Sequence, residues 1–135
     1  MEERHGIILA STIEAKRFGV KTGEAIWQAK QKCPDLITLT PNYDRYVRFS
    51  KLSRDIYADY TDRVEPFGLD EAFLDVTGNP KAFSDGYAIA DEIRKRIKFE
   101  LGVTVSIGAS YNKIFAKLMA KGYSSPDIRE VMERL

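Results

Sequence analysis

The sequence predicts an α+β fold in which helices cover one face of an antiparallel sheet, preceded by a small helical subdomain. A long helical pattern over residues 43–60 precedes two β-prone runs, at 64–67 and 72–76, which only a short turn separates. A second long helical pattern follows at 87–101. Because the hairpin lies between two long helices in the chain, the order favours a sheet with its helices on one face.

The helical subdomain is predicted over residues 11–41, where short helical segments follow one another closely. Thr22 can cap the second of these helices through its hydroxyl group. Pro34 ends that helix, because proline cannot continue the hydrogen-bonding pattern. The expected elements in and before this region are a strand at 6–10, helices at 11–18 and 24–32, and a strand at 36–39.

The helix at 43–60 carries one continuous apolar stripe. Asn42 is well suited to cap its N-terminus. The stripe recurs at steps of three and four residues, as one face of a helix does, and consists of Tyr46, Phe49, Leu52, Ile56 and Tyr60. The tyrosines have two interpretations, stacking on nucleic-acid bases or packing in the core, and the helical spacing favours the core.

The helix at 87–101 repeats isoleucine every four residues and ends at Gly102, a typical residue just beyond a helix. Basic residues at 94–96 and 98 lie around its outer face. They can touch phosphate, but a solvated surface is the default interpretation. The remaining expected elements are a strand at 103–107, a helix from Asn112 to about 121 and a final helix at 126–135.

The composition is that of one globular domain of 135 residues, with 44% hydrophobic and 30% charged residues. A net charge of +1 gives no global basic field, which neither supports nor excludes a nucleic-acid partner. Cys33 and His5 are single, so no disulfide or zinc pattern is present. No apolar stretch reaches membrane-spanning length, and the polar start is unlike a signal peptide. We therefore expect a reducing, cytoplasmic setting and no membrane partner.

Asp70 and Glu71 are adjacent acids at the turn of the predicted hairpin. Two carboxylates raised out of an apolar strand pair suit Mg²⁺, which takes one or two carboxylates and completes its shell with water and phosphate oxygens. Two such ions can clamp the attacking and leaving oxygens of phosphoryl transfer. For the dipeptide alone, the competing interpretation is a pair of solvated turn residues.

The segment 67–77, Phe-Gly-Leu-Asp-Glu-Ala-Phe-Leu-Asp-Val-Thr, resembles the catalytic palm motif of Y-family translesion DNA polymerases of the DNA polymerase IV type. The resemblance runs in order and without interruption from Gly6 to Lys117. Further similar segments are 14–23 to the fingers motif, 41–46 to the start of the long palm helix, 105–108 to a later palm strand and 112–117 to the helix after it.

This resemblance implies a ferredoxin-like polymerase palm with a fingers subdomain. The implied parts are a truncated start at 1–10, fingers at 11–41, palm at 42–121 and a divergent C-terminal helix at 122–135. The implied reaction is transfer of a deoxynucleotide from its triphosphate to a primer 3′ hydroxyl on a DNA primer–template, with two Mg²⁺ per active site in the intact family. By resemblance, Asp70 and Glu71 are catalytic and metal-binding, two of the family's three metal acids.

The resemblance also assigns residues to the substrates. Lys16 stands where the family usually has an arginine that contacts the triphosphate, and lysine keeps the charge but loses the two-pronged geometry. Ile13 and Gly68 replace the family's usual tyrosine and serine. Lys113 and Lys117 can hold primer–template phosphates, with surface solvation as the competing interpretation.

Two departures from the family pattern shape the expected activity. The family's first strand, with an Asp-x-Asp sequence and an aromatic steric gate, precedes the region matched here, and the segment after Lys117 does not match. The chain alone is therefore expected to be inactive. We also expect self-association, through an exposed sheet edge or through the final helix.

Two other functions stay open. One is a non-catalytic nucleic-acid-binding or scaffold module that retains the palm fold. The other is a different phosphoryl-transfer enzyme on the same kind of palm, such as a nucleotide cyclase. The absence of a Gly-Gly-acid-acid turn and the continuous fingers match argue against the cyclase.

Overall fold

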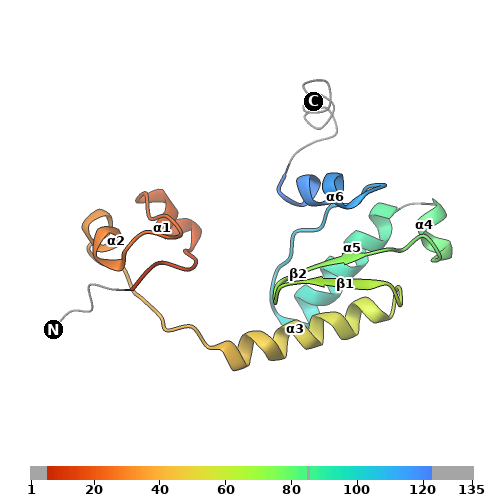
Figure 1. Cartoon of the computed structure of the whole chain (residues 1–135), viewed down its shortest axis with the longest axis horizontal. Coiled ribbons are helices and arrows are strands. Elements are labelled where there is room, and N and C mark those ends of the chain that lie inside the picture. Colours follow the sequence, from red (N-terminus) through yellow and green to blue (C-terminus); the bar gives the residue numbers. More distant parts are fainter. Residues whose placement is uncertain (1–5, 85, 123–135) are drawn as a thin grey trace, which may run out of the picture. The chain divides into compact units, whose positions relative to one another are not determined.

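The computed structural model describes residues 6–84 and 86–122, and the predicted helix at 126–135 lies outside them. The chain divides into two compact units, Met1–Pro41 and Asn42–Leu135. Figure 1 shows the elements of each unit, which are α1 (Ile13–Arg17), α2 (Ile26–Lys32), α3 (Tyr43–Ala58), β1 (Val64–Phe67), β2 (Glu71–Leu74), α4 (Pro80–Ser84), α5 (Gly86–Arg96), the π-helical turn η1 (Ile97–Leu101) and α6 (Lys113–Ala120).

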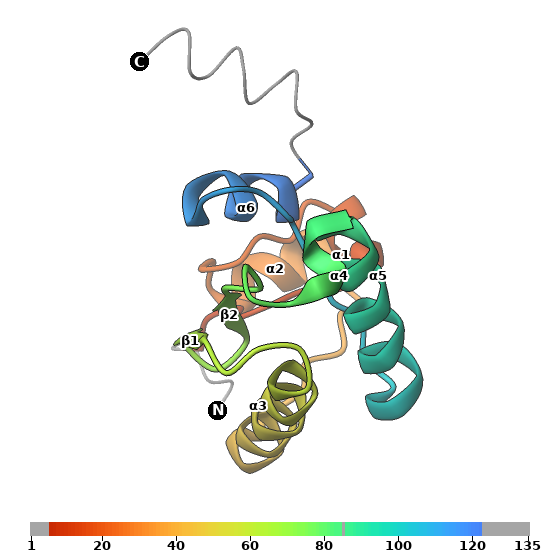
Figure 2. The ribbon, with the colours of Figure 1, turned by 90° about the vertical axis from the view of Figure 1, so that its right-hand side faces the viewer.

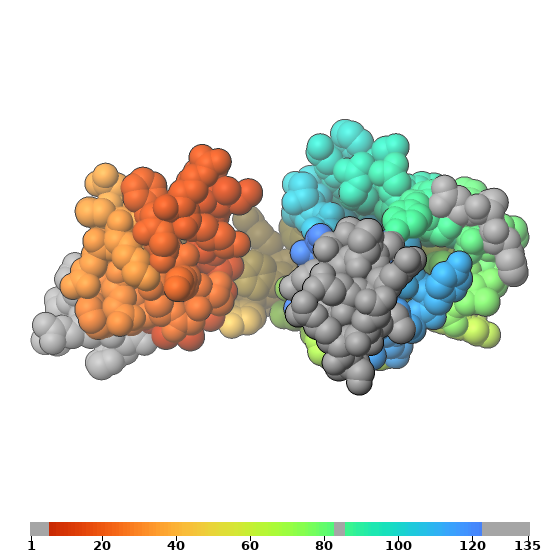
Figure 3. Space-filling model, turned by 90° about the horizontal axis from the view of Figure 1, so that it is seen from above, coloured from red at the N-terminus to blue at the C-terminus, as the bar shows by residue number. Residues whose placement is uncertain are grey.

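The first unit is a pair of short helices around a small apolar core. The core consists of Ile8, Ala15, Val20 and Ala29. Thr12 caps α1 by accepting a hydrogen bond from the Ala15 amide at 3.2 Å. In the space-filling view, α1 and α2 (red to orange) pack as one body (Figure 3).

The predicted cap and strands of this first unit are wrong in detail. Ala25, not Thr22, is the N-cap of α2, and its amide donates to the Gln28 side chain at 3.2 Å. The expected strand at 6–10 is reduced to a single bridge between Ile7 and Ala25, because its partner segment turns into α2 immediately afterwards. Residues 36–39 form no strand, since no other strand lies beside them in the described chain.

The second unit is built around the β1–β2 hairpin. The strands are antiparallel, with Val64 opposite Leu74 and Phe67 opposite Glu71. Leu74 packs against the core of this unit, which consists of Ile56, Tyr60, Ile89, Ile93 and Ile97 from α3, α5 and the residues that follow them. The long helices α3 and α5 therefore cover one face of the hairpin, which confirms the predicted α+β class.

The helix α6 lies on the other side of the hairpin from α3, as the two ribbon views show (Figures 1 and 2). Asn42 and Asn112 cap α3 and α6 as predicted, each accepting a backbone N–H bond at 3.0 Å. The strand predicted at 103–107 is not formed, because a strand needs a hydrogen-bonded neighbour and the sheet in the described chain has only two strands. Val105 from this segment still packs against the core.

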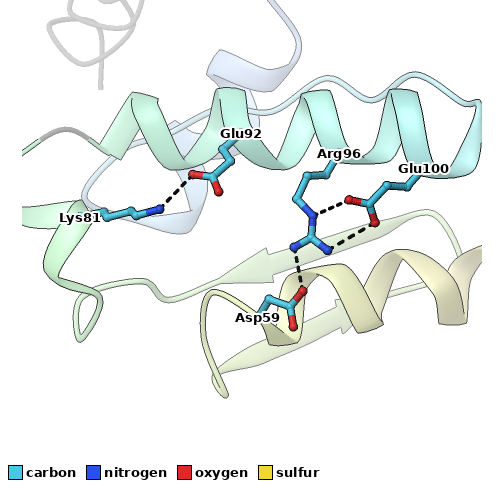
Figure 4. Close-up of polar contacts among 5 residues, drawn as sticks. All are labelled: Asp59, Lys81, Glu92, Arg96 and Glu100. Atoms are coloured by element: carbon cyan, nitrogen blue, oxygen red, sulfur yellow. Dashed lines mark hydrogen bonds and ion pairs between the residues drawn. The ribbon is translucent and has the colours of Figure 1, made fainter.

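Charged side chains tie the helices of the second unit together (Figure 4). Arg96 reaches Asp59 at the end of α3 and Glu100 in η1, each at 2.7 Å. Lys81 of α4 pairs with Glu92 of α5 at 3.3 Å. The carboxylates beside Arg96 raise the pKa of its guanidinium, so it stays charged. These ion pairs connect α3, α4, α5 and η1 at the surface of the unit.

Candidate metal centre at the hairpin tip

The turn between β1 and β2 presents two adjacent carboxylates to solvent. Gly68 has a positive φ of 76°, a left-handed conformation that favours glycine. The Arg54 side chain of α3 donates to the Gly68 carbonyl at 3.3 Å and ties the turn to the helix. Asp70 ends the turn and Glu71 begins β2, and both are exposed. Of the predicted site residues, Asp70 and Glu71 therefore lie next to each other at the hairpin tip.

The hairpin has an outer face that is opposite to the core. Alternate residues of a strand share a face, and the register places Glu65, Phe67, Glu71 and Phe73 together on this side. The rings of Phe67 and Phe73 meet edge to face with centroids 6.2 Å apart. The outer face therefore combines two aromatic rings with two carboxylates, one of which belongs to the tip.

Two lysines of α6 reach this outer face. Lys117 Nζ lies 2.9 Å from a carboxylate oxygen of Glu71 and 4.4 Å from the ring centroid of Phe67. Lys113 pairs with Glu65 and lies 5.6 Å from the ring centroid of Phe73. Each lysine thus contacts one acid and one aromatic ring. We call these contacts the Lys117 clamp and the Lys113 clamp.

The position of α6 depends on a close approach to Gly108. A Cβ at this position would lie 2.0 Å from the Ala116 carbonyl oxygen and 2.5 Å from the Ala120 amide nitrogen. Such distances are far below van der Waals contact, so only glycine permits this packing. Because residue 108 is glycine, α6 can pack close enough to the hairpin for its lysines to contact it.

Asp75 is the third acid of this segment, and its own contacts keep it from acting as a metal ligand. It accepts hydrogen bonds from the Thr77 hydroxyl at 2.6 Å and the Thr77 amide at 3.0 Å, and it pairs with Arg63 at 3.2 Å. These contacts, chiefly those from Thr77, lower the pKa of Asp75 to about 2. Asp75 therefore anchors the end of the hairpin.

The donor set at the tip fits a weak, hard-oxygen site. Asp70 and Glu71 supply carboxylate oxygens, and Mg²⁺ usually takes one or two carboxylates and keeps several waters. Among residues 6–84 and 86–122, no group of three His, Cys, Asp or Glu side chains is close enough to hold a metal. The two carboxylates suit an ion that brings further ligands with it.

Lys16 belongs to the other compact unit and is exposed on α1. In the same unit, Lys32 joins the Gly19 carbonyl, at 3.0 Å, to the Glu24 carboxylate. Glu24 also accepts a bond from the Lys21 amide at 2.7 Å. The bond from Lys32, followed by the one from Lys21, lowers the pKa of Glu24. The contacts of Lys32 and Glu24 thus hold the loop after α1. Lys16 enters no ion pair with another described residue.

Sequence reasoning did not identify Glu65, Phe67 and Phe73 as partners of the two α6 lysines. The alternation of Glu65 and Phe67 in β1 was the available signal, because it marks one face of a strand. The lysines that contact this face lie 48 and 46 residues away from their acids in the chain. Helical spacing alone does not reveal such a distant pairing.

Comparison with known proteins identifies the family. The model of the impB/mucB/samB family matches residues 1–121. The DNA polymerase IV of Acetivibrio thermocellus is 59% identical over 118 residues, which are 87% of this chain and 30% of that protein. The chain spans about a third of the length of the relatives it matches.

Solved structures agree with this assignment. A Y-family DNA polymerase chimera superposes with a TM-score of 0.84 at 31% identity, over 90% of this chain and 36% of that one. The insertion ternary complex of Dbh DNA polymerase gives a TM-score of 0.81 at 28% identity, over 92% and 39% of the two chains. The chain therefore belongs to the impB/mucB/samB family, and its resemblance to the Y-family DNA polymerases is confirmed.

Proposed function

We propose that this chain supplies the fingers and the carboxylate-bearing palm of a translesion DNA polymerase. The reaction would be transfer of a deoxynucleotide from its triphosphate to a primer 3′ hydroxyl on a DNA template. The observation that carries the proposal is the exposed pair Asp70 and Glu71 at the hairpin tip, in a chain 59% identical to a DNA polymerase IV. A cytoplasmic location, where DNA and nucleotides are available, is part of the same proposal.

In this proposal the tip carboxylates hold divalent cations, with Mg²⁺ as the expected ion. The ions would supply charge neutralisation and alignment of the reacting oxygens. Both side chains are exposed, and the two residues are adjacent where the turn meets β2, which supports this role. Lys16 would contact the triphosphate as a compact cation without the two-pronged geometry of arginine.

Lys113 and Lys117 are proposed to contact DNA phosphates, as the resemblance implies. Both ammonium groups are engaged with hairpin acids in this structure. Their side chains remain more than a third exposed, at 59% for Lys113 and 36% for Lys117. Phosphate contact therefore requires each lysine to share or exchange its carboxylate partner.

The test is a chimera in which residues 6–122 replace the matching segment of the Acetivibrio thermocellus DNA polymerase IV. We expect Mg²⁺-dependent primer extension that is lost on Asp70→Ala and retained on Asp62→Ala, a nearby exposed acid outside the tip. The 135-residue chain alone is expected to give no robust extension. A folded, DNA-binding chimera without activity would contradict the proposal.

A non-catalytic DNA-binding or scaffold module is the second candidate function. It is favoured by the absence of a three-acid group among the described residues. The two candidates differ in one measurement, because a scaffold would bind primer–template with an affinity that does not depend on Asp70 or on added nucleotide. A polymerase part in the chimera would gain affinity when the matching nucleotide and Mg²⁺ are added.

Self-association is proposed as a further property. The described sheet has only two strands, and backbone groups on the far edge of a strand can recruit another chain. Light scattering over a concentration series would show a mass that rises with concentration. A constant monomer mass, with and without the last ten residues of the chain, would contradict it.

A further inference from the structure

We propose that the Lys117 ammonium group is the resident counter-cation of Glu71, which a divalent ion must displace in order to bind at the hairpin tip. This inference rests on the proposed metal-binding role of Asp70 and Glu71. It goes beyond that role because it assigns Lys117 a competing function at the same carboxylate.

The geometry of the Lys117 clamp supports direct competition. The ammonium nitrogen lies 2.9 Å from Glu71, the distance of a charge-assisted hydrogen bond. A metal ion needs carboxylate oxygens at about 2.1 Å, and the ammonium already occupies Oε2 of Glu71. Two cations in contact with one carboxylate repel each other at such separations, although water screens the repulsion at this exposed site. Metal binding therefore requires Lys117 to withdraw or to rotate away.

The ring of Phe67 gives Lys117 a second attachment. The ammonium lies 4.4 Å from the ring centroid, within the range of a cation–π interaction. The lysine is therefore held over the outer face by two contacts. Moving it away from Glu71 costs part of both, which lowers the apparent affinity for the metal.

The Lys113 clamp provides a matched control within the same helix. Lys113 is four residues before Lys117 on α6 and makes the same kinds of contact, with Glu65 and Phe73. Glu65 lies opposite Phe73 in the ladder, whereas Glu71 is next to the turn. The two lysines thus share chemistry and helix but only Lys117 contacts a tip carboxylate.

The test is a Mg²⁺ titration of the 135-residue chain, followed by the NMR shifts of the amides of residues 70–72. We expect Lys117→Gln to tighten the apparent Mg²⁺ dissociation constant by about two- to fivefold, the range of an exposed ion pair. Lys113→Gln should change it by less than about 1.5-fold, since that charge acts only at a longer, screened distance. Lys117→Arg, which restores the cation, should return the constant towards the original value.

Each outcome of the titration either supports or overturns the role of Lys117. If Mg²⁺ binds at the tip and Lys117→Gln leaves its affinity unchanged or weaker, the inference is overturned while the metal site stands. If Mg²⁺ binds at the tip of none of the four proteins, both the inference and the proposed metal site fail. Thermal unfolding of all four, monitored by circular dichroism, checks that α6 remains folded.

Discussion

The two faces of the hairpin differ in what their contacts do. The inner face packs Leu74 against the buried core of the unit, and this apolar burial stabilises the unit. The outer face carries Glu65, Phe67, Glu71 and Phe73, with lysines of α6 above them. The two faces of one strand pair thus carry different kinds of contact, because the exposed ion pairs of the outer face contribute little to folding and remain exchangeable.

The largest expected effect comes from the core against which the inner face packs. Ile97 is fully buried in the core, so Ile97→Ala should lower the free energy of unfolding by about 2–5 kcal/mol. Phe99 lies in the same π-helical turn but is 79% exposed, and Phe99→Ala should have little effect. Urea unfolding of both variants measures the contrast. Equal losses would show that the burial of Ile97 does not stabilise the core.

The core and the helices were predictable from the sequence because their signals are periodic and local. The isoleucines at every fourth position predicted the buried face of α5. Asn42 and Asn112 predicted where α3 and α6 begin. The strands expected at 6–10, 36–39 and 103–107 were wrong, since β propensity records side-chain preference and not the presence of a neighbouring strand.

The candidate site was predictable only in part. Asp70 and Glu71 could be placed at the turn because the apolar runs on either side of them fix the hairpin. The engagement of Lys117 with Glu71 could not, because it joins a helix and a turn that are distant in sequence. The close approach at Gly108 likewise depends on tertiary packing, which no local pattern encodes.

A second, smaller effect concerns the helix over the outer face. Gly108→Ala should displace α6, because the added Cβ would lie 2.0 Å from the Ala116 carbonyl oxygen. We expect a loss of about 1–3 kcal/mol, as for other overpacked sites, and faster amide exchange in α6. Gly78→Ala is the control, since a Cβ there meets nothing within 4 Å. Unchanged exchange in α6 would show that Gly108 does not determine its position.

The ion pairs of the outer face should matter still less for stability. Glu71→Gln and Glu65→Gln each remove the ion pair of one clamp, and each should change the free energy of unfolding by less than about 1 kcal/mol because the pairs are exposed. Chemical denaturation at low and high salt tests this. A loss of several kcal/mol for either variant would mean that the outer face is structural.

The smallest effect is expected at the end of the hairpin, where Asp75 has a pKa of about 2 against an ordinary value of 3.8. A lowered pKa means that the ionised form favours folding. This contribution is therefore complete above about pH 4 and is lost as the pH falls towards 2. Thermal melts should show Asp75→Asn less stable than the parent protein near pH 6, with the difference vanishing near pH 2. A difference independent of pH would contradict this assignment.

The most direct test of the central claim, that the hairpin tip binds divalent cations through Asp70 and Glu71, is Mn²⁺ line broadening in the NMR spectrum of the 135-residue chain. We expect broadening centred on the amides of residues 70 and 71, with the buried residues Ile89 and Ile93 much less affected. The pattern should disappear in Asp70→Asn. Broadening centred elsewhere, or broadening at the tip that survives Asp70→Asn together with Glu71→Gln, would contradict the claim.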